Sequence, residues 1–181
     1  HESGHAILFH VLRDVGPVYT VSIIPTGMGA AGYTMPLPER DDMFMTRGRM
    51  LQEIMVSLGG RIAEEIIFDD ITTGASSDIK RATGIARKMV TKFGMSENVG
   101  VICYDDDDDE VFIGRDLAHA KAHSELVSGE IDREIKKIID GCYAKAKELI
   151  LQNEAVLHES AKLLLEKEKI GRDEFEALFG A

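Results

Sequence analysis

The chain has 181 residues, of which 44% are hydrophobic and 29% are charged, and its formal net charge is −11. This composition is typical of a globular protein, and it excludes a strongly basic chain, so nucleic acid is not an expected partner. No apolar run approaches the roughly 20 residues of a membrane-spanning helix, and we therefore expect this stretch of sequence to be soluble. The two cysteines, Cys103 and Cys142, lie far apart and are predicted to be buried free thiols of a reducing compartment.

The first five residues, H-E-S-G-H, fit the pattern H-E-x-x-H and open a helix predicted over residues 1–14. Residues i and i+4 of a helix share a face, so His1 and His5 can offer ring nitrogens to one zinc ion. Glu2 lies about 100° round the helix, where its carboxylate can accept a proton from water activated by the metal. The pattern predicts a zinc peptidase. The competing interpretation is a salt-bridged surface helix with two incidental histidines.

Two strands are predicted next, over residues 19–25 and 31–35, because β-branched and aromatic residues gather there. Pro36 and Pro38 prevent the second strand from continuing as a central strand. We expect a hairpin near the metal helix. Its residues Gly32, Tyr33 and Thr34 are candidates for binding the substrate backbone by β-augmentation, and the alternative is a purely structural hairpin.

A long helix is predicted over residues 46–68, where apolar residues recur at helical spacing. Gly59 and Gly60 interrupt it, and each costs about 1 kcal/mol relative to alanine inside a helix. Such a pair is tolerated where another backbone passes close by. We expect that backbone to belong to the metal helix.

A third metal ligand is required, because a catalytic zinc ion has three protein ligands and one open position. The candidates are Glu64 and Glu65 on the 46–68 helix and Asp78 at the start of a helix predicted over residues 77–93. Asp78 could instead be a favourable charge at a helix N-terminus. Spacing does not choose among the three, although a glutamate from a second helix is the commoner solution in zinc peptidases.

The rest of the chain carries no recognisable chemical motif. A short strand is possible over 99–104, the acidic run 105–110 is predicted to be a solvated loop, and 111–116 is predicted to pack. Helices are predicted over 124–153, 154–168 and 173–179, with Asn153 and Asp173 as N-caps. We interpret this C-terminal part as a subdomain for packing or subunit contact.

The motifs of the chain resemble, almost from end to end, the peptidase domain of FtsH-type membrane-anchored AAA proteases. The matching segments include H-E-S-G-H-A, A-A-G-Y-T, L-G-G-R-I-A-E-E-I-I-F, T-T-G-A-S-S-D-I-K-R-A and F-G-M-S. The resemblance implies that Zn²⁺ is held by His1, His5 and Asp78, with Glu2 as the general base. It also places Glu64 near the site, where it could hold one histidine in its ligating tautomer.

The fold that we expect is mainly α, with a small β-hairpin or sheet near the active site, a zincin-like metal helix and a C-terminal helical subdomain. Residues 1–181 are expected to be one zinc peptidase domain, with a catalytic core over 1–120 and the helical subdomain over 121–181. The chain lacks the G-x-x-x-x-G-K-[ST] motif of an ATP site. The family's ATPase module and membrane anchor are therefore expected to precede residue 1 in a longer chain.

The resemblance implies a zinc-dependent endopeptidase domain of an ATP-dependent protease that degrades unfolded or membrane proteins. Its expected partners are polypeptide substrates and further copies of itself in a homo-hexamer. The full-length protein is expected to be anchored in a bacterial inner membrane, or else an organellar membrane, with this domain in the cytoplasm. The main alternative is a ring-forming assembly module with a structural metal or none, and a non-peptidase zinc hydrolase is a further one.

Overall fold

The computed structural model describes residues 1–26, 31–37, 43–105 and 124–180. These residues form mostly helices and one small three-stranded antiparallel sheet, which confirms the predicted mainly α fold. In chain order the elements are α1 (Glu2–Val11), β1 (Val18–Ser22), β2 (Tyr33–Pro36), α2 (Arg47–Phe68), η1 (Thr73–Ala75), α3 (Ser76–Thr91), α4 (Glu125–Gln152), α5 (Glu154–Lys167), β3 (Lys169–Gly171), α6 (Arg172–Glu176) and η2 (Ala177–Phe179).

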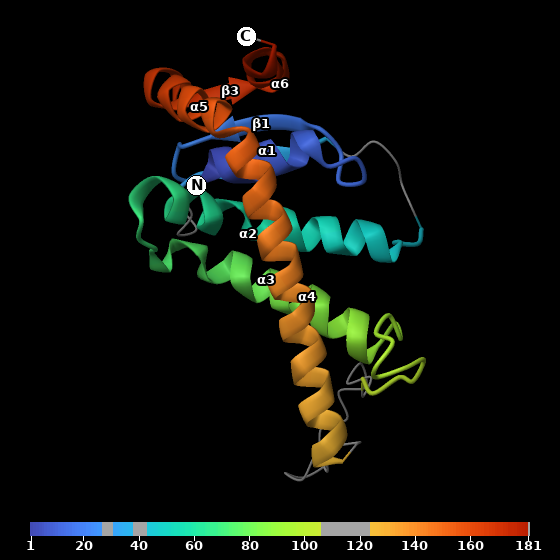
Figure 1. Ribbon diagram of the computed structural model, residues 1–181. Helices are drawn as coiled ribbons and strands as arrows, with labels where there is room; N and C mark the ends of the chain where they lie inside the picture. Colours follow the sequence, from blue (N-terminus) through green and yellow to red (C-terminus); the bar gives the residue numbers. More distant parts are fainter. Residues whose placement is uncertain (27–30, 38–42, 106–123, 181) are drawn as a thin grey trace, which may run out of the picture.

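Helices α1 to α4 lie on one side of β1 (Figure 1). Figure 1 shows α1 between β1 and α2, with α3 beyond α2 and the long helix α4 crossing all three, and each of these pairs is in contact. Buried apolar residues of all four helices and of β1 form one core. The C-terminal elements α5, β3 and α6 lie beyond β1, and α5 and α6 contact α1 and β1 respectively.

The α1 and α2 backbones approach closely at the predicted glycine pair. A Cβ atom on Gly4 would lie 2.3 Å from the carbonyl oxygen of Gly59, and one on Gly59 would lie 2.8 Å from that of Gly4. Neither position can hold a side chain without moving the two helices apart. The expected close approach of the metal helix is therefore confirmed.

Strand β1 is the centre of the sheet, between β2 and β3. Val21 pairs with Thr34 of β2 and with Ile170 of β3, and both pairings are antiparallel. The predicted hairpin is confirmed. Strand β3 was not expected, because its three residues find their partner about 150 positions away in sequence. Residues 169–171 thus add a third strand to the sheet beside α1.

Several predicted boundaries need correction. Helix α1 ends at Val11 rather than at residue 14, and β1 ends at Ser22 rather than at residue 25. No strand forms over 99–104. The Val101 side chain is 93% exposed, so it does not pack against other apolar residues as a strand residue would. The N-cap of α6 is Gly171 and not Asp173, and Cys103 is exposed rather than buried.

Three predictions fall outside the described residues. They are the acidic run beyond residue 105, the packed segment over 111–116 and the domain boundary between residues 120 and 121. The division into core and subdomain stays a prediction. Across the ranges that the structure describes, no helix combines the length and the apolar composition needed to cross a bilayer.

Candidate metal centre

The two histidines of H-E-x-x-H converge as the helical spacing requires. His1 is the residue that precedes α1, and His5 lies one turn along it. Their Nε2 atoms are 3.1 Å apart, and the ring planes make an angle of 74°. Both nitrogens face the same point beside the helix, so one ion could bind both.

Asp78 joins them from α3, a helix that begins far along the chain. Its Oδ2 atom lies 3.2 Å from His1 Nε2 and 3.5 Å from His5 Nε2. Burial alone would raise the pKa of this carboxyl. The hydrogen bonds and positive charge of the two imidazoles outweigh burial and hold the pKa of Asp78 far below its usual range. The carboxylate is therefore ionised, as a metal ligand must be.

The local turn before α3 is what brings Asp78 to the histidines. Helix α2 ends with Asp69 in the left-handed conformation, at a φ of 49°. The Thr72 side chain then caps the short 3₁₀ turn by accepting a hydrogen bond from the Gly74 amide, at 3.1 Å. Helix α3 follows directly, so Asp78 stands in its first turn beside α1.

The three side chains fit a zinc ion. Their Nε2, Nε2 and Oδ2 atoms form a triangle with edges of 3.1, 3.2 and 3.5 Å. Tetrahedral zinc with bonds of 2.0–2.1 Å needs donor atoms about 3.3 Å apart. Within the described part of the chain, no other group of His, Cys, Asp and Glu side chains meets in this way.

Residues of α2 orient both imidazoles by contacts with their Nδ1 atoms. Glu64 Oε1 lies 2.7 Å from His1 Nδ1, and the backbone carbonyl of Val56 accepts a hydrogen bond of 2.7 Å from His5 Nδ1. With its proton on Nδ1, each ring presents a bare Nε2 to a metal. The pKa of metal-free His1 is raised to about 9, chiefly by its hydrogen bond to Asp78.

Two contributors to this orientation have no signal in the sequence pattern. The Val56 contact is made by a backbone carbonyl, which every residue possesses. At Gly60, the His1 ring occupies the place of a side chain, because a Cβ atom there would lie 2.4 Å from His1 Nε2. Close approach at the glycine pair was predicted, but not that an imidazole would fill the space at Gly60.

The other two candidate ligands have different surroundings. Glu64 is buried, and its Oε1 atom lies within hydrogen-bond distance of His1 Nδ1, the ring nitrogen that faces away from Asp78. Its second oxygen accepts hydrogen bonds from the backbone N–H and the hydroxyl of Thr72. Glu65 faces α4, where it accepts a hydrogen bond from the Tyr143 hydroxyl and lies 2.9 Å from Lys147 Nζ. Neither carboxylate belongs to the triangle of donor atoms.

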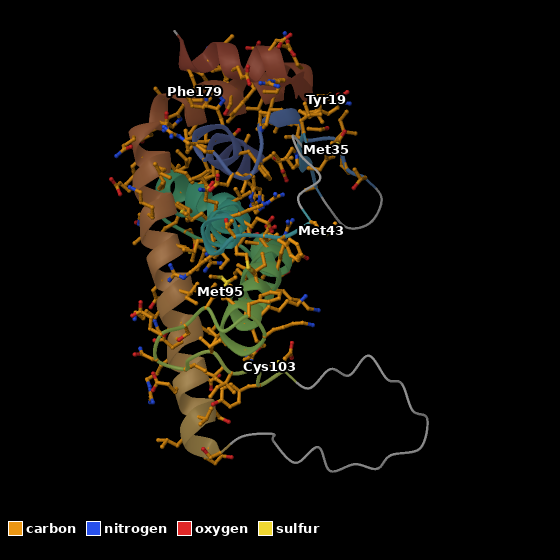
Figure 2. The ribbon with its side chains drawn as sticks, turned by 90° about the vertical axis from the view of Figure 1, so that its right-hand side faces the viewer. Tyr19, Met35, Met43, Met95, Cys103 and Phe179 are labelled. Atoms are coloured by element: carbon orange, nitrogen blue, oxygen red, sulfur yellow. The ribbon has the colours of Figure 1, made fainter. Side chains whose placement is uncertain are left out.

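A cleft runs past the histidines and exposes the remaining predicted site residues. Glu2 lines it from α1, and Gly32, Tyr33 and Thr34 line it at and just before β2. The Thr34 hydroxyl lies 2.8 Å from Glu2 Oε2. In Figure 2, Met35 of β2 lies on the side of the molecule opposite α4. The predicted base and the predicted substrate strand therefore share the cleft with the histidines.

These features together define a metallopeptidase-type site: an H-E-x-x-H helix, a carboxylate from a second helix and a cleft beside an edge strand. The profile of peptidase family M41 matches residues 1–178. The chain belongs to peptidase family M41, and the predicted resemblance is confirmed.

Three similar proteins carry the name FtsH. The chain is 52% identical over 178 residues to the ATP-dependent zinc metalloprotease FtsH of Caldicellulosiruptor bescii, covering 98% of this chain and 29% of the relative. It is 50% identical over 179 residues to FtsH 1 of Thermoanaerobacter sp., covering 99% and 29%. With FtsH of Thermotoga maritima the values are 45% over 174 residues, 96% and 28%. These names support the predicted metalloprotease and give no support to the assembly-module alternative.

Proposed function

We propose that this chain is the zinc-dependent endopeptidase domain of a longer ATP-dependent protease, with His1, His5 and Asp78 as the protein ligands of one Zn²⁺. The observation that carries the proposal is the triangle of their three donor atoms, whose edges match the donor spacing of tetrahedral zinc. Two of the three donor atoms belong to residues one helix turn apart, and the third belongs to α3, which is distant in sequence but adjacent in space. Incidental surface histidines would not meet a buried orienting carboxylate and a third donor in this way.

A bound zinc ion supplies a Lewis acid that polarises a peptide carbonyl and lowers the pKa of water to about 7. The Glu2 carboxylate accepts the proton of the attacking water and then passes it to the nitrogen of the leaving amine. Glu64 and the Val56 carbonyl hold the two imidazoles in the tautomer that leaves Nε2 free. The reaction is hydrolysis of a peptide bond within a polypeptide.

The substrate backbone is proposed to bind along β2. This strand is at the end of the sheet order β2-β1-β3, so one of its edges has no partner among the described strands. Gly32, Tyr33 and Thr34 line the cleft beside the histidines. An extended polypeptide can add to such an edge through main-chain hydrogen bonds, which do not depend on its side chains.

The remaining proposals concern the whole protein. The chain spans 29% of the length of the first relatives, which are named ATP-dependent proteases. We propose that an ATPase module in the same full-length chain delivers unfolded or membrane polypeptides to residues 1–181, that the protein is a homo-hexamer, and that it is anchored in a membrane with this domain in the cytoplasm. The likeness to those relatives supports these proposals.

The test separates the base from the ligands. Glu2→Gln should keep about one zinc ion per chain while cleavage of an unfolded polypeptide falls by about 100-fold or more, because a positioned base contributes 10²–10⁴-fold. Asp78→Asn should lose zinc. Asp70→Asn, an exposed carboxylate in the preceding loop, is the matched control and should change neither. Unchanged turnover in Glu2→Gln would refute the proposed role of Glu2.

A further inference from the structure

The candidate base is held by a residue of the neighbouring strand. Thr34 Oγ1 lies 2.8 Å from the Oε2 atom of Glu2 and 3.0 Å from the backbone carbonyl oxygen of Glu2. We propose that Thr34 is the positioning residue of the base, and that its hydroxyl aims the Glu2 carboxylate into the cleft. This inference rests on the proposed role of Glu2, and it adds a role for the Thr34 side chain to the predicted binding of the substrate backbone by residues 32–34.

The geometry makes the Thr34 hydroxyl a directional support. A threonine hydroxyl has one hydrogen to donate, and both of its neighbours here are acceptors on Glu2. The carboxylate is the closer of the two, and a hydrogen bond to an ionised group is the stronger kind. The bond removes rotational freedom from a long side chain that must meet its proton at hydrogen-bond distance.

Gly32 leaves room for the same side chain next to β1. A Cβ atom on Gly32 would lie 3.0 Å from Glu2 Cγ and 3.3 Å from Glu2 Oε1. The same atom would lie 2.5 Å from the carbonyl oxygen of Ser22, so glycine also lets the chain pass close to β1. The segment that enters β2 thus contacts one carboxylate oxygen through Thr34 and approaches the other at Gly32.

The contact between Thr34 and Glu2 means that β2 both supports the proposed base and lines the cleft. Residues 32–34 line the cleft, and β2 has one edge without a partner among the described strands, whereas the Thr34 side chain reaches Glu2. The hydroxyl touches none of the three proposed zinc ligands. Loss of the hydroxyl should therefore reduce kcat and leave zinc content and KM nearly unchanged, whereas a purely structural role would reduce stability without this split.

The experiment compares Thr34→Val and Thr34→Ser with Thr20→Val in the zinc-loaded protein, using an unstructured peptide substrate. Thr20 is the matched control because its hydroxyl also donates from the same sheet, but to the backbone carbonyl of Ile170 at 3.1 Å and not to Glu2. We expect Thr34→Val to lower kcat by about 10- to 100-fold, the value of a hydrogen bond to a charged group. KM should stay within about twofold, Thr34→Ser should restore most of kcat, and Thr20→Val should leave it within about twofold.

The outcomes distinguish failure of the proposed role of Thr34 from failure of the proposed function. If Glu2→Gln is inactive while Thr34→Val keeps full kcat, the inference fails and the proposed function stands. If Glu2→Gln is fully active, the proposed function itself fails. A Thr34→Val variant that loses zinc, or a Thr34→Ser variant as slow as the valine one, also overturns the inference. Thr34→Ala, which removes the hydroxyl without adding bulk, carries the same expectation where the valine variant does not fold.

Discussion

Oε1 of Glu64 lies 2.7 Å from Nδ1 of His1, although the two residues are 63 positions apart. Two hydrogen bonds from Thr72 fix the other oxygen of the same carboxylate. Because Glu64 is buried and tied at both oxygens, α2 determines the direction in which the first proposed zinc ligand points.

The Glu64→Gln variant should therefore bind zinc more weakly without losing it. Partners that orient a ligating histidine are worth about 10- to 100-fold in metal affinity, and we expect a loss within that range by competition with a chelator. Glu65→Gln is the matched control, because Glu65 binds Tyr143 and Lys147 instead, and its zinc affinity should equal that of the parent protein. Complete loss of zinc in Glu64→Gln would make Glu64 a ligand.

Gly60→Ala should abolish zinc binding, because its Cβ atom would overlap the ring position of His1. Gly84→Ala, in the middle of α3, is the matched control. A Cβ atom there meets nothing within 4 Å, so this variant should bind zinc normally and gain up to about 1 kcal/mol of stability. Zinc content and thermal unfolding measure both effects. Normal zinc content in Gly60→Ala would show that the ring does not lie over this glycine.

The pKa of His1 in the metal-free protein should be measurable by an NMR titration of its ring. We expect a midpoint near pH 9, because Asp78 and Glu64 favour the charged imidazole despite its partial burial. The contacts of the charged imidazole with Asp78 and Glu64 stabilise the fold fully below about pH 6.5, and this contribution to stability is lost as the pH rises through 9. In Asp78→Asn the midpoint should move down toward 6.5. A midpoint already near 6.5 in the unmodified chain would contradict the described contacts.

A second pH dependence comes from Glu134 of α4, whose partners are not residues of the metal centre. This buried carboxylate accepts hydrogen bonds of 2.6 Å from Ser96 and 2.7 Å from Asn98, which lower its pKa below the usual 4.5. Its stabilising effect is complete above pH 4.5 and is lost as the pH falls through the lowered value. Glu134→Gln should therefore cost about 1–3 kcal/mol in denaturant unfolding at pH 7 and progressively less in acid.

Glu148→Gln is the control for that comparison, because Glu148 lies exposed on the same helix. It should change the free energy of unfolding very little at any pH. Equal stabilities of the Glu134 variant and the parent at pH 7 would show that the Ser96 and Asn98 bonds contribute nothing net.

The helices were predictable because their signals are local. The long helix α2 was located from apolar spacing within two residues of its true ends, and Thr46 caps it as such a residue should. Strand β3 was missed because its three residues carry no periodicity, and its existence depends on β1. The error over 99–104 has the same origin: the Gly100 and Tyr104 amides donate to Ser96 and Thr91, not to a strand.

In the metal centre, too, local features were predictable and features that depend on packing were not. The spacing of His1 and His5 is a property of one helix turn, so the sequence alone predicts their convergence. The choice among Glu64, Glu65 and Asp78 depends on how α2 and α3 pack on α1, which spacing does not contain. Only the resemblance to known peptidases pointed to Asp78, and the packing now explains why Glu64 faces the outer nitrogen of His1 instead.

The central claim is tested most directly by anomalous diffraction at the zinc absorption edge from crystals of the zinc-loaded protein. We expect a single peak about 2.0–2.2 Å from Nε2 of His1, Nε2 of His5 and a carboxylate oxygen of Asp78. Glu64 should stay bound to the outer nitrogen of His1. A peak coordinated by Glu64 in place of Asp78, or zinc bound away from the two histidines, would contradict this account.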